Sequence, residues 1–419
     1  MNERNHPVII LVLQGLLFAY PILLLTVKGG MGASFILLVL LSVYLLFSTW
    51  RKQAERIMDR DAWLFGAAMS ATLLGVASSQ LYHLKVDASA FDSPARFLLS
   101  VPIFLMLRKA DLKVFGMMQY GFPAGAIVIA TLIGMSGQKI HAKTDFLAHI
   151  HLGDLALMLG FLSALSINWM QKDRRILVIL KILGLFAGLY VSLLSGARGG
   201  WIAIPVLMIA GVLLSPKFNR SAIVRLAVAS ALIVSGTILS YYLLDIVQIR
   251  VNAAISDLTS VTPDTSLGIR FQLWEAAFRL FLQNPVFGVG ADGFALAMDQ
   301  MVHSGAITET AAGFGKGGAH SYYFAVLSRF GLVGLISLLL LFLVPLWMFY
   351  QVANSRSGFH RRAAKMGVAL VLGFAVFCIS EEMFNMKMVA TFYGVTLAVL
   401  LAAASNRPLG AAWKDEAVK

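Results

Sequence analysis

Three polar passages organise this chain: Gly268-Ile269-Arg270-Phe271-Gln272-Leu273-Trp274, Asn284-Pro285-Val286-Phe287-Gly288-Val289-Gly290 and Gly317-Gly318-Ala319-His320-Ser321-Tyr322-Tyr323. They belong to a stretch of about 75 residues, 261–335, whereas the other apolar runs are joined by a few to about fifteen residues. A long polar insert with a histidine at the start of an apolar helix is typical of a functional loop. We therefore expect the functional site in this stretch.

The composition predicts an all-α polytopic membrane protein. Hydrophobic residues make up 59% of the 419 residues and charged residues only 13%. A soluble protein of this size could not bury so much apolar surface. The single cysteine, Cys378, excludes disulfides within the chain. The first apolar run follows Arg4 without a small-residue cleavage site, so we expect a retained helix and not a removed signal peptide.

Twelve apolar runs are long enough to cross about 30 Å of hydrocarbon at 1.5 Å per residue. They are 7–27, 32–50, 62–79, 94–107, 112–135, 146–169, 176–194, 199–214, 222–244, 321–350, 364–379 and 388–404. Twelve spans place both termini on one side of the membrane. They divide the chain into nine spans (1–244), a large loop (245–320) and three further spans (321–419).

The formal net charge of +13 is distributed unevenly over the two sides. The termini and even-numbered connections hold 21 of the 34 Lys and Arg residues and eight acids, while the odd-numbered connections hold twelve of each. The positive-inside rule makes the even side cytoplasmic and accounts for the charge without nucleic acid. We therefore expect the large loop to lie outside the cytoplasm; in a bacterial inner membrane of a Gram-negative cell, this side is the periplasm. Because ATP and nucleotide sugars are absent there, its substrate must arrive already activated.

Arg198 lies in the short turn Ser195-Gly196-Ala197-Arg198-Gly199-Gly200 between two spans. An arginine at membrane depth costs free energy unless it meets an anion or a cavity. Its neighbouring glycines allow a ligand to approach the backbone amides at the start of a helix, where phosphate binds. The alternative is an interfacial arginine that extends to lipid phosphate.

Arg270 lies near the start of an amphipathic helix predicted over 267–283, with Ser266 as its expected cap. The helix dipole disfavours a cation there, so an anionic partner is indicated, with a surface ion pair as the alternative. Asn284-Pro285 ends this helix. We expect a second short helix over 292–302 and a flexible glycine-rich run over 313–318.

His320 precedes the tenth span on the outer side. Its ordinary pKa near 6.5 suits a general base, although a lone histidine is more often structural. Lys387 is another outer base, with Glu381 and Glu382 as possible partners. The weaker candidates for binding substrate are Gln80, His83, Trp274, Tyr322 and the cluster Lys139, His141, Lys143 and His149.

Several common signals are absent from the sequence. The outer loops contain no Asp-x-Asp pair for a divalent metal, no zinc-type spacing and no serine nucleophile elbow. Gly288-x-Gly290-x-x-Gly293 matches a dinucleotide fingerprint only by its letters, because no βαβ unit surrounds it. We therefore expect no metal and no cofactor.

The order of the motifs resembles that of the O-antigen ligase and polymerase superfamily. The resemblance covers about 195–335 and consists of Ser-Gly-Ala-Arg198-Gly, Arg270-x-x-x-Trp274, Asn284-Pro285-x-Phe287-Gly288-x-Gly290, Ala319-His320-Ser321 and Phe330-Gly331-Leu332-Val333-Gly334-Leu335. Twelve spans with one large periplasmic loop resemble the ligase branch in particular. Two positions depart from the family pattern: Ser321, where Asn often follows the histidine, and Arg329, where Glu is common.

This resemblance implies a GT-C-like fold and a metal-independent, inverting glycosyl transfer. The donor would be O-antigen polysaccharide on undecaprenyl diphosphate, and the acceptor a sugar hydroxyl of lipid A-core. Arg198 and Arg270 would bind the diphosphate, since guanidinium forks suit phosphate oxygens. His320 would take the proton of the acceptor hydroxyl.

Three other functions remain open. An O-antigen polymerase would use the same donor twice. A protein O-oligosaccharyltransferase is disfavoured, because those relatives usually carry a longer periplasmic tail. A lipid-linked sugar transporter predicts charges along a path through the membrane, but the charges counted as within spans are Asp154 and Lys181, which lie on different levels.

Overall fold

The computed structural model describes residues 6–53, 58–138, 141–213, 245–259, 262–355 and 358–406, together with scattered positions between 224 and 242. Throughout these residues the chain is helical or irregular and contains no strand. The helices of the bundle are α1 (His6–Thr26), α2 (Gly30–Gln53), α3 (Arg60–His83), α4 (Asp92–Leu107), α5 (Met118–Met135), α6 (His149–Leu165), α7 (Arg175–Ser195), α8 (Arg198–Trp201), α9 (Ala203–Leu213), α15 (Tyr322–Ser355), α16 (Gly358–Ser380) and α17 (Lys387–Ala404).

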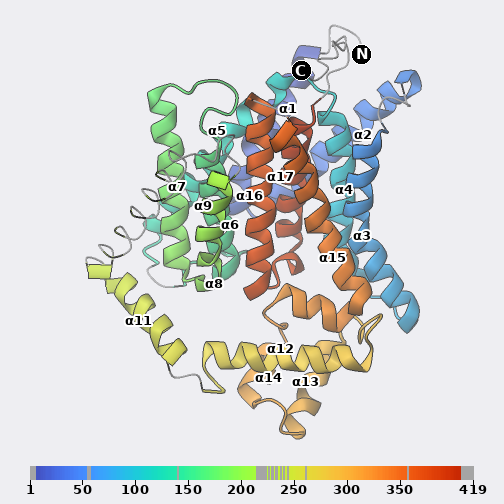
Figure 1. The fold of residues 1–419 in the computed structure, drawn as a ribbon, viewed down its shortest axis with the longest axis vertical. Helices are drawn as coiled ribbons and strands as arrows, with labels where there is room; N and C mark the ends of the chain where they lie inside the picture. The colour runs from blue at the N-terminus through green and yellow to red at the C-terminus, as the bar shows by residue number, and fades with distance from the viewer. Residues whose placement is uncertain are drawn as a thin grey trace.

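The insert between α9 and α15 carries four further described helices: α11 (Asp245–Thr259), α12 (Ser266–Gln283), α13 (Gly293–His303) and α14 (Glu309–Gly315). Three 3₁₀ turns, η3 (Ala88–Phe91), η4 (Leu112–Met117) and η5 (Met383–Asn385), lie in the connections of the bundle. In Figure 1, α12, α13 and α14 lie together beyond one end of the bundle, and α12 runs across that end.

The prediction of an all-helical membrane protein is confirmed, whereas the number of spans is not. Within the described ranges, nine helices are long and apolar enough to cross a membrane. Two of the predicted spans are shorter: α6 has 17 residues, and the run 199–214 is broken at Ile202 into α8 and α9. Most of the predicted span 222–244 lies outside the described residues.

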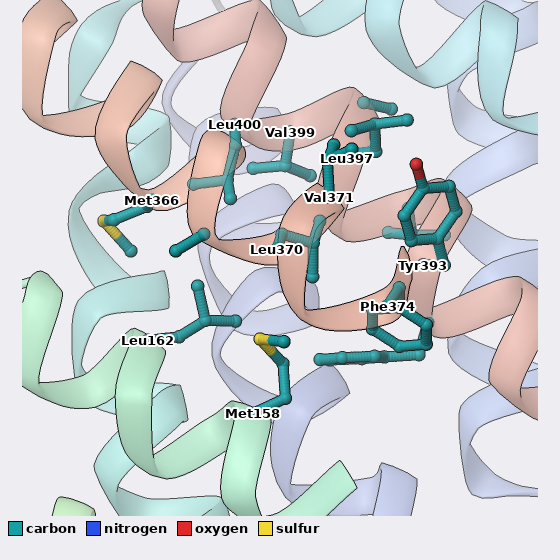
Figure 2. Close-up of a cluster of buried hydrophobic side chains, with 14 of the residues drawn as sticks. Met158, Leu162, Met366, Leu370, Val371, Phe374, Tyr393, Leu397, Val399 and Leu400 are labelled. Carbon is teal, nitrogen blue, oxygen red and sulfur yellow. The ribbon is translucent and has the colours of Figure 1, made fainter. Parts of the chain in front are cut away.

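The core of the bundle lies where α6, α16 and α17 meet. Figure 2 shows Met158 and Leu162 of α6 facing Met366, Leu370 and Phe374 of α16, all of them buried. Gly188 of α7 allows this helix to pack closely against α6. A Cβ at this position would lie only 2.3 Å from the carbonyl oxygen of Ala156. Small residues at helix contacts are the usual way to pack apolar helices closely in a membrane.

The connections predicted to share a side of the membrane contact one another. On the even side, Arg362 donates to the carbonyl of Asn168, and Asn406 donates to the carbonyl of Arg108 over 3.2 Å. At the other end, the ring of His83 lies 2.9 Å from the carbonyl oxygen of Gly288 in the insert. These contacts agree with the predicted alternation of the spans.

The insert has its own small core. Ile269, Leu273 and Leu280 on one face of α12 pack with Phe294 and Met298 of α13 and with residues of α14 and α15. The bounds predicted for α12 and α13 agree with the structure to within one or two residues. The glycine-rich run predicted as flexible begins inside a helix, since α14 continues to Gly315.

The long helix α15 is broken at Gly331, which has φ 62° and ψ −154°. The segment after α12 docks on this break, where Pro285 accepts from the amide of Leu332 at 2.8 Å and Val289 donates to the carbonyl of Ser328 at 2.9 Å. A Cβ on Gly331 would lie 2.5 Å from the backbone of Val286. The Asn-Pro and Phe-Gly motifs therefore fix the insert against the start of α15, next to His320.

Candidate active site

A cavity of about 430 Å³ lies between the insert and the adjacent end of the bundle. Arg198, Arg270 and His320, the three predicted catalytic residues, all line it. They come from α8, from the second turn of α12 and from the turn before α15. The other residues of its wall are His141, His149, Ile150, Gly196, Ala197, Gly199, Asp264, Ser266, Ile269, Thr310, Phe314 and Ser380.

The turn that carries Arg198 is packed without spare volume. Gly196 ends α7 in the left-handed conformation, with φ 70°. A Cβ on Gly199 would lie 2.1 Å from Oγ of Ser380, and a Cβ on Gly200 would lie 1.9 Å from Oδ1 of Asp154. No alanine fits at either position unless its neighbour moves. Gly199 and Gly200 are thus packed against side chains of the protein itself, and the approach of a ligand to their backbone amides stays a prediction.

Asp154 supports this turn from below. Its side chain is fully buried in α6, and neither carboxylate oxygen has a hydrogen-bond partner among the described residues. Burying a carboxyl group without a partner is costly. The carboxyl group of Asp154 packs directly against Gly200, so it borders the turn that bears Arg198.

Arg270 lies one turn into α12. The cap of this helix is Thr265, whose side chain accepts from the amide of Gly268, so the prediction of Ser266 as the cap is wrong. Ser266 instead accepts from Nη1 of Arg270 at 3.3 Å, because its hydroxyl lies one turn before the guanidinium group. Asp264, the one acidic residue of the cavity wall, accepts from the hydroxyl of Thr308 at 2.8 Å.

His320 is held in a strained turn. Its φ of 49° is uncommon for a residue with a side chain. The turn is fixed by Glu382, which accepts from the amide of Ala319 and also lies 2.8 Å from Nη1 of Arg329. Gly318, two residues before His320, has φ 139°, and a Cβ there would lie 2.2 Å from Oε1 of Glu382. The His320 side chain remains 26% exposed.

Glu381 faces the same histidine. Its Oε2 lies 3.6 Å from Nδ1 of His320, which is too long for a hydrogen bond but close enough for electrostatic attraction. Burial raises the pKa of the Glu381 carboxyl, but the interaction with His320 and the charge of His151 outweigh burial and leave the pKa below its ordinary value. Glu381 is therefore a carboxylate at neutral pH.

The predicted partners of Lys387 were wrong. Glu381 faces His320 and Glu382 binds Arg329, whereas Lys387 forms an exposed ion pair with Asp92 at 3.3 Å. Glu381 and Glu382 are close to Lys387 in the sequence. The sequence could not show that the 3₁₀ turn η5 between them points the two carboxylates away from Lys387.

Of the weaker candidates, Gln80, His83, Trp274 and Tyr322 lie outside the cavity wall. The side-chain amide of Gln80 makes two hydrogen bonds, of 2.9 and 3.0 Å, to the backbone of Asp87. Nε2 of His83 lies 2.9 Å from the carbonyl oxygen of Gly288. Trp274 stacks on Phe324 with ring centroids 5.3 Å apart. Tyr322 contacts the ring of Phe384. These side chains hold the site together rather than line it.

Two members of the histidine and lysine cluster before α6 do reach the cavity. His141 and His149 line its wall, with ring centroids 4.7 Å apart. The sequence did not single out Ser380, Thr310 or Phe314, since no motif or spacing distinguishes them. Over the described part of the chain, no three His, Cys, Asp or Glu side chains lie close enough together to hold a metal ion.

Comparison with known proteins agrees with the motifs. A protein family described as O-antigen ligase matches residues 183–339, a segment that contains Arg198, Arg270 and His320. An uncharacterized protein of Haemophilus influenzae is 28% identical over 274 residues, which cover 64% of this chain and 67% of that protein.

A protein of Escherichia coli K12 named O-antigen ligase is 25% identical over 203 residues, 46% of either chain. The matched segment, the order of its motifs and these relatives agree with one another. Over residues 183–339 the chain is similar to the O-antigen ligase family.

Proposed function

We propose that this protein is an O-antigen ligase that transfers a polysaccharide from undecaprenyl diphosphate to a sugar hydroxyl of lipid A-core on the periplasmic side of the inner membrane. The observation that carries the proposal is the meeting of Arg198, Arg270 and His320 around one cavity. These residues are far apart in the sequence, and their types match the needs of a diphosphate leaving group and a hydroxyl nucleophile.

The two arginines bind the diphosphate of the donor. A guanidinium group offers several N–H donors in a planar fork that suits phosphate oxygens, and it stays charged at any physiological pH. The charge on the diphosphate grows as the sugar leaves, so cations already in place stabilise the transition state more than the ground state. In this way the arginines take the part that a divalent metal has in other transferases.

His320 acts as the general base. The acceptor oxygen forms a bond to the anomeric carbon as the bond from that carbon to the diphosphate oxygen breaks, and the leaving group takes the electron pair. The proton of the acceptor hydroxyl passes to Nε2 of His320. Glu381 faces Nδ1, which favours the tautomer with the hydrogen on Nδ1 and stabilises the imidazolium that forms. Attack from the side opposite the leaving group inverts the configuration.

Transport is less well supported than transfer. The buried Lys181 is bound by Gln119, Ser166 and Asp173, so it belongs to a closed structural network and not to a path shared with Asp154. A polymerase would use the same cavity and donor and would differ only in its acceptor.

The test is a transfer assay with the purified protein, lipid-linked glycan and lipid A-core in the presence of EDTA. We expect glycan on lipid A-core. Extension of the lipid-linked glycan would identify a polymerase instead, and the absence of both products would contradict glycosyl transfer.

His320→Ala should lower transfer by about 10²–10⁴-fold, because that is the usual contribution of a general base. The matched control is His303→Ala, which removes an exposed histidine of α13 outside the cavity wall. Both variants should reach the membrane at equal levels. Wild-type transfer by His320→Ala would remove this residue from the mechanism.

A further inference from the structure

Helix α12 has two apolar faces. The buried face packs into the core of the insert, through Ile269, Leu273, Ala276, Ala277 and Leu280. At about 100° per residue, the opposite face carries Phe271, Trp274, Phe278, Phe281 and Leu282. Phe271, Phe278 and Leu282 are 52%, 46% and 58% exposed. The helix therefore presents a row of large apolar side chains, of which Phe271, Phe278 and Leu282 are exposed, whereas Trp274 and Phe281 are partly buried.

The exposed face itself contains no charged residue. At one edge Glu275 and Arg279 form an ion pair at 2.5 Å along the helix, and Arg270 borders the other edge. Clusters of exposed apolar residues mark contact surfaces for membranes or proteins. Aromatic rings are enriched where a protein meets the boundary between lipid headgroups and acyl chains.

The depth of α12 follows from its contact with α15. The part of α15 after the break at Gly331 has 24 residues (332–355) and is about 36 Å long, enough to cross the hydrocarbon layer. The part before the break (322–330) therefore lies at the level of the headgroups. Trp274 stacks on Phe324 in this part, so α12 lies at the same level.

The orientation of α12 agrees with this depth. Figure 1 shows α12 running across the end of the bundle rather than along it. A helix in the membrane plane, with one aromatic face and a neutral ion pair at its edge, has the form of an interfacial helix.

We infer that the face formed by Phe271, Trp274, Phe278, Phe281 and Leu282 lies in the outer leaflet, at the boundary between headgroups and acyl chains. The membrane is thus the occupant of this surface, and α12 is an interfacial anchor of the insert. This inference concerns lipid contact alone and stands apart from the proposed reaction. Because Arg270 belongs to α12, the interfacial anchor holds it at the depth where the phosphates of lipids lie.

Depth-dependent fluorescence quenching tests the inference on the full-length protein in lipid vesicles. In a Cys378→Ala background, Phe278→Cys is labelled with an environment-sensitive fluorophore. The matched control is Gln283→Cys, an exposed position on the same helix about 140° around its axis. Phe271→Cys repeats the measurement at a second position of the face.

We expect lipids with a nitroxide near the headgroup end of the acyl chain to quench the labels at 278 and 271 at least threefold more than the label at 283. Iodide in the water should show the reverse order. Stronger quenching by iodide than by lipid at both 278 and 271 would overturn the inference and indicate a face open to a protein partner. Equal lipid quenching at 278 and 283 would overturn it as well.

Discussion

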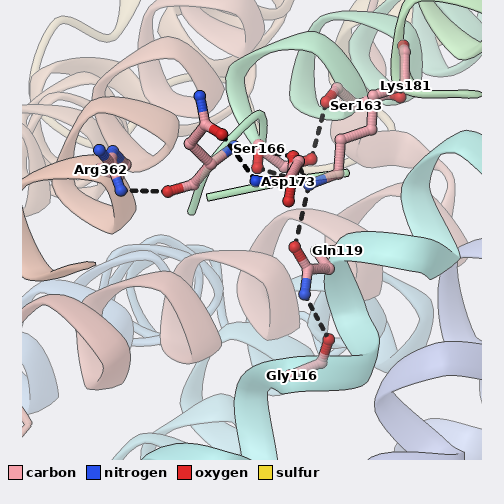
Figure 3. Close-up of polar contacts among 8 residues, drawn as sticks. Gly116, Gln119, Ser163, Ser166, Asp173, Lys181 and Arg362 are labelled. Atoms are coloured by element: carbon pink, nitrogen blue, oxygen red, sulfur yellow. Dashed lines mark hydrogen bonds and ion pairs between the residues drawn. The ribbon is translucent and has the colours of Figure 1, made fainter. Parts of the chain in front are cut away.

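Lys181 and Arg270 are both cations of a mostly apolar chain, but their surroundings differ. Lys181 is fully buried between α5, α6 and α7, where Nζ donates to Gln119 at 2.9 Å, to the carbonyl of Ser166 at 2.8 Å and to Asp173 at 2.8 Å (Figure 3). Arg270 lines a cavity of about 430 Å³ together with Arg198 and His320.

The difference separates a structural charge from a functional one. Around Lys181 the protein supplies every partner, and the same network extends through Asn168 to Arg362 of α16. Around Arg270 the protein leaves a space large enough for part of a ligand. We therefore expect changes near Lys181 to affect stability and changes near the cavity to affect activity.

The largest effect on activity among the following changes is expected for Gly200→Ala. Its Cβ would lie 1.9 Å from Oδ1 of Asp154, so the turn bearing Arg198 has to move. A displacement of about 1 Å in a catalytic group can cost about 100-fold in rate. The transfer rate of the purified variant measures this. Gly66→Ala in α3, where nothing lies within 4 Å of the added Cβ, is the control.

The double variant Gly200→Ala/Asp154→Ala sharpens the same test. Removal of the carboxylate makes room for the added methyl group, so transfer should recover in part. If the single variant is as active as wild type, the close packing beneath Arg198 has no role in the site.

Arg270→Lys should reduce transfer by roughly 10–100-fold, because the variant keeps the charge but loses the planar fork that binds two phosphate oxygens. Arg279→Lys is the control, since Arg279 is an exposed arginine of the same helix paired with Glu275. Steady-state kinetics with lipid-linked glycan measure both variants. Equal rates for the two would contradict bidentate binding by Arg270.

Lys181→Met should have the smallest effect on the rate per folded molecule and a large effect on stability. It leaves the buried Asp173 without its cation, a change that typically costs about 3–5 kcal/mol. Thermal unfolding in detergent should show a lower midpoint, while the folded fraction keeps its transfer rate. A variant that is stable but inactive would place Lys181 in the mechanism and contradict its assignment as a structural charge.

Much of the fold could be predicted from local patterns. Apolar runs gave the membrane-spanning helices, and the 3–4 spacing of Phe271, Trp274, Phe278 and Phe281 predicted α12. The break in α15 was missed because it arises from backbone contacts with the distant segment 285–289. The break between α8 and α9 at Ile202 was missed as well.

The site could be predicted only in part. The positions of Arg198, Arg270 and His320 in the sequence indicated each of them separately as a candidate site residue. The resemblance of the motifs then predicted that the three residues belong to one active site. The partners of Glu381, the cap of α12 and the uses of Gln80 and His83 depend on tertiary contacts. Residues such as Ser380 carry no signal in the sequence, since only the fold brings them to the cavity.

The central claim is that the two arginines form a diphosphate site. The most direct test is equilibrium binding of undecaprenyl diphosphate and undecaprenyl monophosphate to the purified protein and to the Arg198→Gln/Arg270→Gln double variant. The account predicts that the wild-type protein prefers the diphosphate by tenfold or more and that the double variant loses this preference while keeping its fold. An unchanged preference in the double variant would contradict it.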